Sequence, residues 1–191
     1  MRIGVIAEGV TDEPIFEELI PKIEPTVTRV AVRPTRGKPR FLSVFPDLLW
    51  TFPYMAPGGL ADKAIVIRDA NGDDPARVEE AMRRRLAGRR HPAFHRGIEF
   101  HATRRESETW LLADVGAINR VAARIGTGVA TAVPGPLESI TDAKERFIRM
   151  LTEAGLLNVE ETIREVIREI NLPVVRLHCP GFAIFEQKVK R

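Results

Sequence analysis

Cysteine is nearly absent from this chain of 191 residues, in which Cys179 is the single example. One cysteine excludes an internal disulfide and any cysteine-rich zinc cluster. The chain also lacks the run of about eighteen apolar residues that a membrane-spanning helix requires. Residues 1–7 are too few and lie too close to acids to form a secretory signal. These absences predict a cytoplasmic protein that does not enter a membrane.

The chain has little net charge, +3 at pH 7, but its arginines are concentrated between residues 77 and 105. A local excess of positive charge can bind phosphate groups. A solvated helix face is the alternative interpretation, since basic runs are common on exposed helices. The arginines predicted to contact nucleic acid are Arg83, Arg84, Arg89, Arg90, Arg104 and Arg105.

A strand–turn–helix pattern stands at the centre of the chain. Residues 64–67 form a β-branched apolar run, typical of a buried parallel strand, and Arg68 and Asp69 end it. A polar turn with Asn71 follows, and Asp74 before Pro75 is typical of a helix start. In open α/β sheets, ligands bind beyond the carboxyl ends of such strands.

The same pattern occurs at the beginning of the chain. Residues 2–7 form an apolar run that ends at Glu8, and Thr11 or Asp12 can cap the helix that follows. Apolar residues at four-residue spacing from Ile15 to Ile23 indicate one buried helical face. If the two strands lie side by side, Glu8 and Asp69 leave the sheet at the same edge.

The remaining segments predict further strands at 26–32 and 98–103 and a helix at 41–50. Other helices are expected after residue 75, at 110–125, from 141 or 142 onward and at 159–170, with loops at 53–62 and 126–141. The apolar tail from residue 172 is expected to pack back onto the domain. The predicted fold is α/β, with a small, mainly parallel sheet flanked by helices and a helical C-terminal third. Residues 1–125 would form the core and 126–191 an extension packed on it, within one compact domain.

The acids that end the two strands are candidate ligands for a hard cation. Magnesium takes one or two carboxylates, keeps several waters and binds substrate phosphate. Glu8 is a candidate general acid or base. The alternative is that Asp69, Asn71 and Asp74 only form turns and helix caps. The adjacent His178 and Cys179 are interpreted as core residues.

The order of Glu8-Gly9, Asp69-Ala-Asn71 and Glu108-Thr-Trp-Leu-Leu-Ala-Asp114 resembles the toprim-like families. More specifically, the chain resembles a prokaryotic family known as domain of unknown function 4276. Later pieces agree with that family: Pro136-Leu-Glu138-Ser-Ile140, Asp142-Ala-Lys144 and His178-Cys-Pro-Gly-Phe182.

Toprim domains of overcoming-lysogenization-defect nucleases use a glutamate and an Asp-x-Asp pair for magnesium-dependent phosphodiester chemistry. The resemblance implies that Glu8 and Asp69 are catalytic and that Asn71 replaces the second aspartate. The implied ligands of Mg²⁺ or Mn²⁺ are Glu8, Asp69, Asn71, Asp73 and Glu108.

The resemblance thus implies a nuclease or phosphotransferase acting on nucleic acid, with a defence role beside a partner ATPase. The alternative is a non-catalytic module that binds nucleic acid or a protein through a degenerate acidic site.

Overall fold

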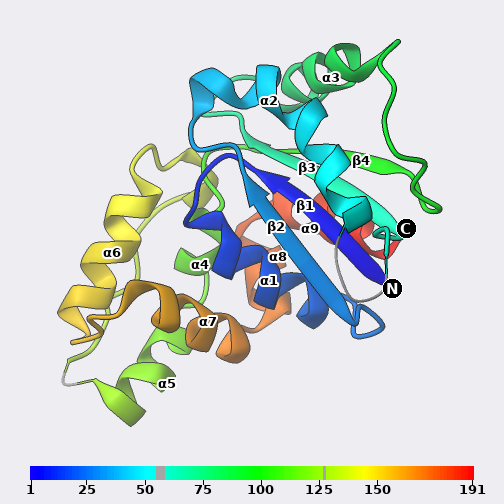
Figure 1. Ribbon diagram of the computed structural model, residues 1–191. Coiled ribbons are helices and arrows are strands. Elements are labelled where there is room, and N and C mark those ends of the chain that lie inside the picture. The colour runs from blue at the N-terminus through cyan, green and yellow to red at the C-terminus, as the bar shows by residue number, and fades with distance from the viewer. Residues whose placement is uncertain (55–58, 127) are drawn as a thin grey trace.

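A computed structural model describes residues 1–54, 59–126 and 128–191 and contains one four-stranded sheet (Figure 1). The strands are β1 (Arg2–Ala7), β2 (Arg29–Pro34), β3 (Lys63–Asp69) and β4 (Ile98–Thr103), in the order β2-β1-β3-β4. Every neighbouring pair is parallel, and the register places Val5 beside both Val32 and Ile65. The predicted α/β fold with a parallel sheet is therefore confirmed.

The central strands β1 and β3 are buried on both faces, which explains why each is a nearly continuous apolar run. Ile3 and Val5 point into one core, whereas Ile6 points into the other. A strand with one solvated face would alternate polar and apolar residues instead.

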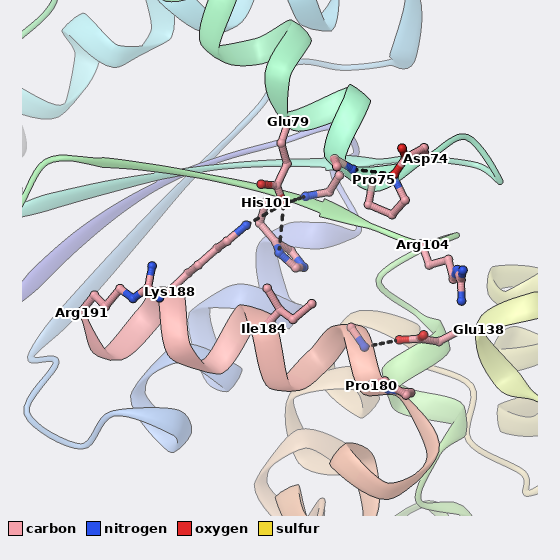
Figure 2. Close-up of a pocket in the computed structure, with 13 residues that line it drawn as sticks. Asp74, Pro75, Glu79, His101, Arg104, Glu138, Pro180, Ile184, Lys188 and Arg191 are labelled. Carbon is pink, nitrogen blue, oxygen red and sulfur yellow. Dashed lines mark hydrogen bonds and ion pairs between the residues drawn. The ribbon is translucent and has the colours of Figure 1, made fainter.

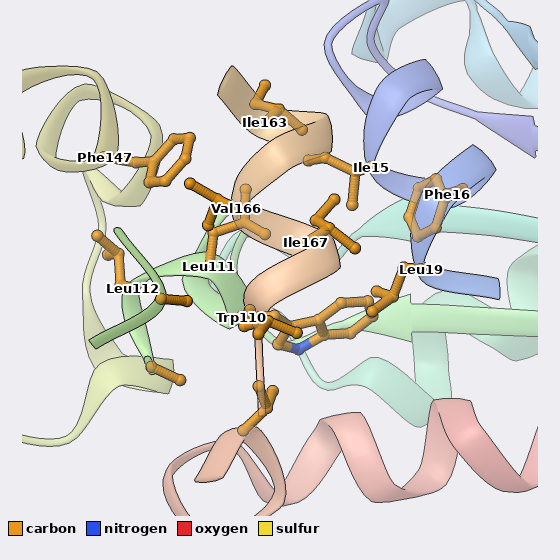
Figure 3. Packing of buried hydrophobic residues seen from close by; sticks show 14 of the residues in the cluster. Ile15, Phe16, Leu19, Trp110, Leu111, Leu112, Phe147, Ile163, Val166 and Ile167 are labelled. Carbon is orange, nitrogen blue, oxygen red and sulfur yellow. The ribbon is translucent and has the colours of Figure 1, made fainter. Parts of the chain in front are cut away.

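The first face of the sheet is covered by α1 (Asp12–Ile23) and α9 (Pro180–Lys190). Outside α1 lies α7 (Val159–Glu169), and α5 (Val115–Ile125) packs against α7. Trp110 of α4 (Thr109–Leu112) lies among residues of α1 and α7 (Figure 3), and its ring stacks on Phe185 of α9. Two further C-terminal helices, α6 (Ala143–Glu153) and α8 (Leu172–His178), contribute to the same core. The C-terminal third thus supplies part of the layer that buries the sheet.

The second face is covered by α2 (Phe41–Leu48), the 3₁₀ helix η2 (Leu49–Tyr54) and α3 (Pro75–Leu86). Phe41, Phe45 and Phe52 fill the space above β1 and β3. Val78 and Met82 of α3 belong to the same core. On α3 these residues follow the four-residue spacing that the sequence predicts, and the arginines lie outside.

The connections that follow β1 and β3 lead to opposite edges of the sheet. The chain leaves β1 through α1 to reach β2, and it leaves β3 through α3 to reach β4 on the other side of the sheet. Because α1 and α3 cover opposite faces, the carboxyl ends of β1 and β3 form a topological switch point. In open α/β sheets this is the place where ligands bind.

Several predicted boundaries need correction. The second strand spans Arg29–Pro34, because residues 26–28 connect α1 to the sheet. The predicted helix at 41–50 is divided into α2 and η2, and the short 3₁₀ helices η1 (Lys38–Arg40) and η3 (Leu137–Ser139) were not predicted. Of the predicted loops, residues 55–58 and 127 lie outside the described residues. His178 was wrongly predicted to be in the core: it is exposed, and only Cys179 is buried.

Among the helices that the structure describes, none has the length and apolar character needed to cross a membrane.

Candidate functional site

Four carboxylates gather at the switch point, and we refer to them as the acid cluster. Glu8 follows β1, Asp12 begins α1, Asp69 ends β3 and Glu108 precedes α4. The charges of the other three acids each raise the pKa of Asp69, which places the four groups within electrostatic reach of one another. The structure therefore brings together Glu8, Asp69 and Glu108 as predicted and adds Asp12.

The pKa of every carboxyl in the acid cluster is raised, and burial is the largest cause in each case. Glu108 and Asp12 are only 5% and 6% exposed, whereas Glu8 and Asp69 are half-buried. For Glu108, burial and the nearby Asp12 raise the pKa to about 7. These acids thus resist ionisation, which is the expected behaviour of buried carboxylates whose neighbours are largely other acids or neutral donors.

Neutral donors hold the acid cluster in place. Asp12 accepts hydrogen bonds from the Gly9 backbone N–H (2.8 Å) and from the Ser107 hydroxyl (2.6 Å). The Thr103 hydroxyl donates to Asp69 Oδ1 at 2.6 Å, from the residue directly beside it on β4. Ser107 also donates to Glu108, at 3.3 Å. Hydroxyl and amide donors orient the carboxylates but do not neutralise them.

Positive charge near the acid cluster is sparse. Arg68 Nε lies 3.7 Å from Glu8 Oε2, which is an ion pair but is too long for a hydrogen bond. Glu8 Oε2 is buried and has no hydrogen-bond partner. The Lys144 ammonium donates to the hydroxyl of Thr11 at 3.0 Å. Arg68 and Lys38 both lower the pKa of Glu8, but burial outweighs them.

The predicted ligands Asn71 and Asp73 lie on the turn after β3, and both side chains are exposed. Asn71 adopts a left-handed conformation (φ 53°), and its amide donates to the backbone carbonyl of Asp69 at 3.1 Å. Arg105 covers the same turn: a Cβ atom on Gly72 would lie 2.5 Å from Arg105 Nη1. The amide of Asn71 therefore stabilises the turn, as Asx side chains commonly do.

The predicted nucleic-acid-binding arginines fall into two groups. Arg83 and Arg84 lie in the last turn of α3, and Arg89 and Arg90 follow it. A helix of twelve residues is about 18 Å long, and α3 runs away from the carboxyl edge of the sheet (Figure 1). Arg83 also pairs with Glu79 at 3.0 Å. The second group, Arg104 and Arg105, follows β4 and lies beside the turn after β3.

Asp12 and Ser107 are the residues that sequence reasoning missed at this site. Asp12 was considered only as a helix cap, yet it accepts a hydrogen bond from Gly9 and lies among the other acids. A second acid four residues after Glu8, within the same turn, was the available signal. No such signal in the sequence marks Ser107, because its contact with Asp12 joins segments that are 95 residues apart.

Across the described residues, no three Asp, Glu, His or Cys side chains are positioned to hold a metal ion directly. The four carboxylates influence one another's pKa without converging on one point. Magnesium commonly binds through one or two carboxylates and completes its shell with waters. The chemical nature of the donors therefore fits a hydrated divalent cation, although the geometry is not that of a closed protein cage.

Comparison with protein-family models, with curated proteins and with solved structures found no match for this chain. The toprim-like resemblance therefore stays an expectation based on the residues.

Proposed function

We propose that the acid cluster supports magnesium- or manganese-dependent hydrolysis of phosphodiester bonds in nucleic acid. The observation that carries this proposal is the gathering of four carboxylates with raised pKa at the switch point of a parallel sheet. Buried acids whose charge is not fully compensated are costly to the fold, and a divalent cation would offset that cost. Raised pKa values of grouped acids are also typical of functional sites.

The residues take separate roles in this proposal. Asp69, Asp12 and Glu108 would hold the cation, directly or through its waters. The bound cation would neutralise charge on the phosphate and lower the pKa of a coordinated water. Glu8, which has a raised pKa and an unpartnered oxygen, would transfer the proton. Arg104 and Arg105, at the same edge, would contact the phosphates of the strand.

The direct test is an assay on single- and double-stranded DNA and RNA with magnesium, manganese or EDTA. Cleavage should require the metal and should be lost in Asp69→Asn and Glu8→Gln. The matched control is Glu80→Gln, which changes an exposed acid on α3 and should cleave like the wild type. Cleavage that persists in EDTA, or in both acid variants, would contradict the proposal.

A second candidate function is a non-catalytic module that binds nucleic acid or a protein partner. The observation that favours it is the turn after β3, where Asn71 replaces the second aspartate and its amide is bonded to the main chain. In that case the chain would bind nucleic acid without cleaving it under any metal condition. Asn71→Asp would also fail to produce activity.

The proposed defence role beside a partner ATPase and the cytoplasmic location remain predictions.

A further inference from the structure

A cavity of about 580 Å³ lies between the start of α3, the outer strand β4 and α9 (Figure 2). Its polar lining residues include Glu79, His101, Arg104, Glu138 and Lys188. Ligand pockets in proteins commonly have volumes of roughly 300–1,000 Å³ and combine apolar walls with a few convergent polar groups. The size of this cavity is therefore that of a small-molecule site.

His101 is the feature of this cavity that points to a ligand. Its side chain is 2% exposed, and neither ring nitrogen has a hydrogen-bond partner. The nearest acid atom, Glu79 Oε1, lies 3.9 Å from Nδ1, beyond hydrogen-bonding distance. Buried polar atoms are almost always partnered, because leaving one unpaired costs about 1–3 kcal/mol. Two unpartnered nitrogens on one ring require an explanation.

The imidazole of His101 is neutral at physiological pH. Burial and the positive charge of Lys188 lower its pKa to about 3. A neutral imidazole offers one N–H donor and one acceptor nitrogen. The ring itself is held by Trp110 and Phe185, whose centroids lie 5.9 and 5.2 Å away. His101 is thus a fixed, neutral ring whose donor and acceptor are not engaged by any described group of the protein.

The neighbouring polar groups of the cavity already have partners. Lys188 donates to Glu79 and to the Phe100 carbonyl, each at 2.6 Å, and the Ala102 N–H donates to Glu79 at 3.2 Å. Glu138 accepts a hydrogen bond from Gly181 at the start of α9, at 2.8 Å. Glu79, Lys188 and Glu138 are therefore engaged by the protein itself, whereas neither ring nitrogen of His101 has a hydrogen-bond partner.

The walls of the cavity favour a flat, mostly apolar ligand. Ala102, Ile184, Pro75 and Pro180 supply apolar surface around His101. A planar heterocycle with donors and acceptors on its edge matches the walls, and it can pair with whichever nitrogen of the imidazole faces it. Nucleobases combine these two properties, and proteins that hold single nucleobases read the edge of the base with hydrogen bonds and sandwich its faces between apolar groups.

The cavity continues toward the acid cluster. A second cavity, of about 670 Å³, shares Asp74, Pro75, Arg104, Glu138 and Pro180 with the first and reaches Gly72, Asp73 and Arg105. Those residues form the turn that follows Asp69 and the guanidinium that covers it. Positive charge is therefore available where a phosphate would lie between the two cavities and the acid cluster.

We propose that the His101 cavity binds the base of a nucleotide, with the base edge on the imidazole and the phosphate toward Arg104 and Arg105. The link to cleavage rests on the proposed function, whereas the binding itself does not. A base within a duplex cannot enter the cavity without leaving its stack, so the proposal selects unpaired nucleotides. The nucleotide is either free in solution or part of a single strand.

Binding should be measured in EDTA with AMP, CMP, GMP and UMP and with matched single- and double-stranded oligonucleotides. Trp50 is exposed, so Trp50→Phe leaves Trp110, beside His101, as the fluorescent reporter. Saturable quenching by the mononucleotides would identify a free nucleotide as the ligand. Quenching by the single-stranded oligonucleotide alone would identify a nucleotide within a single strand as the ligand. No saturable binding of any probe would overturn the proposal.

The key variant is His101→Phe, which keeps a ring against Trp110 and Phe185 but removes both nitrogens. It should weaken binding about tenfold or more, since a hydrogen-bonded pair is lost. His101→Gln retains a donor and an acceptor and should recover part of the affinity. The matched control, His95→Phe, changes an exposed loop histidine and should bind normally. Unchanged affinity in His101→Phe would show that the histidine only fills the core.

Asp69→Asn separates this proposal from the proposed function. Loss of cleavage with nucleotide affinity retained in EDTA would support both. A wild type that binds nucleotides but never cleaves would remove the nuclease proposal and leave the cavity assignment standing. Metal-dependent cleavage by a protein whose nucleotide affinity does not depend on His101 would support the nuclease proposal and remove the cavity assignment.

Discussion

Two groups of carboxylates in this molecule differ in how their charge is compensated. On the surface formed by α1, α5 and α7, which we call the ion-pair surface, several acids form ion pairs with arginines. Arg164 lies 2.8 Å from Glu17, Arg168 lies 2.9 Å from Glu18, and Arg124 pairs with both Glu165 and Glu169. In the acid cluster, the described residues form one ion pair, between Arg68 and Glu8 at 3.7 Å.

The pKa of Glu169 on the ion-pair surface and the pKa values of the acid cluster move in opposite directions. On the ion-pair surface, hydrogen bonds from Arg124 and Arg120 lower the pKa of Glu169. In the acid cluster, burial raises the pKa of all four carboxyls. The fold can pair acids with arginines, as the ion-pair surface demonstrates. At the switch point, among the described residues, only Glu8 has such a pair, and this contrast supports the proposed binding of a cation there.

The largest expected effect is on catalysis. Glu8→Gln removes the proton-transfer group while keeping its size, so the cleavage rate should fall about a hundredfold to ten-thousandfold. Glu17→Gln, on the ion-pair surface, should leave the rate unchanged. The measurement is single-turnover cleavage of a labelled oligonucleotide with magnesium. An equal loss in both variants would remove the functional distinction between the two regions.

Glu108→Gln should stabilise the metal-free protein at neutral pH. The folded pKa of Glu108 is about 7, above its ordinary value of 4.5, so ionisation opposes folding as the pH rises through this range. At about 1.4 kcal/mol per pKa unit, the gain above pH 7 is at most about 3 kcal/mol.

The measurement is urea unfolding of both proteins in EDTA, from pH 4 to pH 8. The difference in unfolding free energy should be smallest below about pH 4.5 and should grow toward pH 7. The comparison must be made between variants at each pH, because the lowered pKa of His101 gives the opposite slope below about pH 6.5. Glu160→Gln, at an exposed position, is the control and should change the unfolding free energy little. A constant difference for Glu108→Gln would contradict the role assigned to its burial.

Divalent cations should stabilise the wild type by linkage. Magnesium or manganese at about a hundred times its Kd should add about 2.7 kcal/mol, provided that the unfolded chain does not bind it. The resulting rise in Tm should be much smaller in Asp69→Asn, whereas Glu17→Gln should respond like the wild type. Thermal unfolding with and without EDTA provides the measurement. Equal melting curves with and without metal in the wild type would favour the non-catalytic module.

The smallest effect is expected on the ion-pair surface itself. Arg164→Gln breaks the pairs with Glu17 and Glu18, which are partly exposed and separated by 2.8 and 3.5 Å. Such pairs contribute at most about 1 kcal/mol each, and salt screens them. The loss of stability should therefore shrink as sodium chloride is raised, as urea unfolding can show. A large loss that is independent of salt would mean that Arg164 acts mainly through packing.

The buried strands and amphipathic helices were predictable because their signal is local. The apolar runs of β1 and β3 and the periodic residues of α1, α3, α6 and α7 define elements within a few neighbouring positions. The acidic residues that end β1 and β3 were predictable for the same reason, since parallel neighbours share an edge. The end of the helix at 41–50 was less predictable, because the pattern does not distinguish an α-helix from the 3₁₀ turn that follows it.

What the sequence alone determined is thus the α/β class, the position of Glu8 and Asp69 at strand ends, and the local excess of arginine. Tertiary structure alone decided which acids are buried together, because Asp12 meets Ser107 and Glu108 across about half of the chain. It also decided that Arg83 and Arg84 on α3, and Arg89 and Arg90 after it, lie away from the acid cluster. Arg104 and Arg105 lie beside the turn that follows Asp69. His101 has no local signature at all. Its two unpartnered nitrogens arise because α9, from the end of the chain, buries the outer strand without supplying a hydrogen-bonding group to that ring.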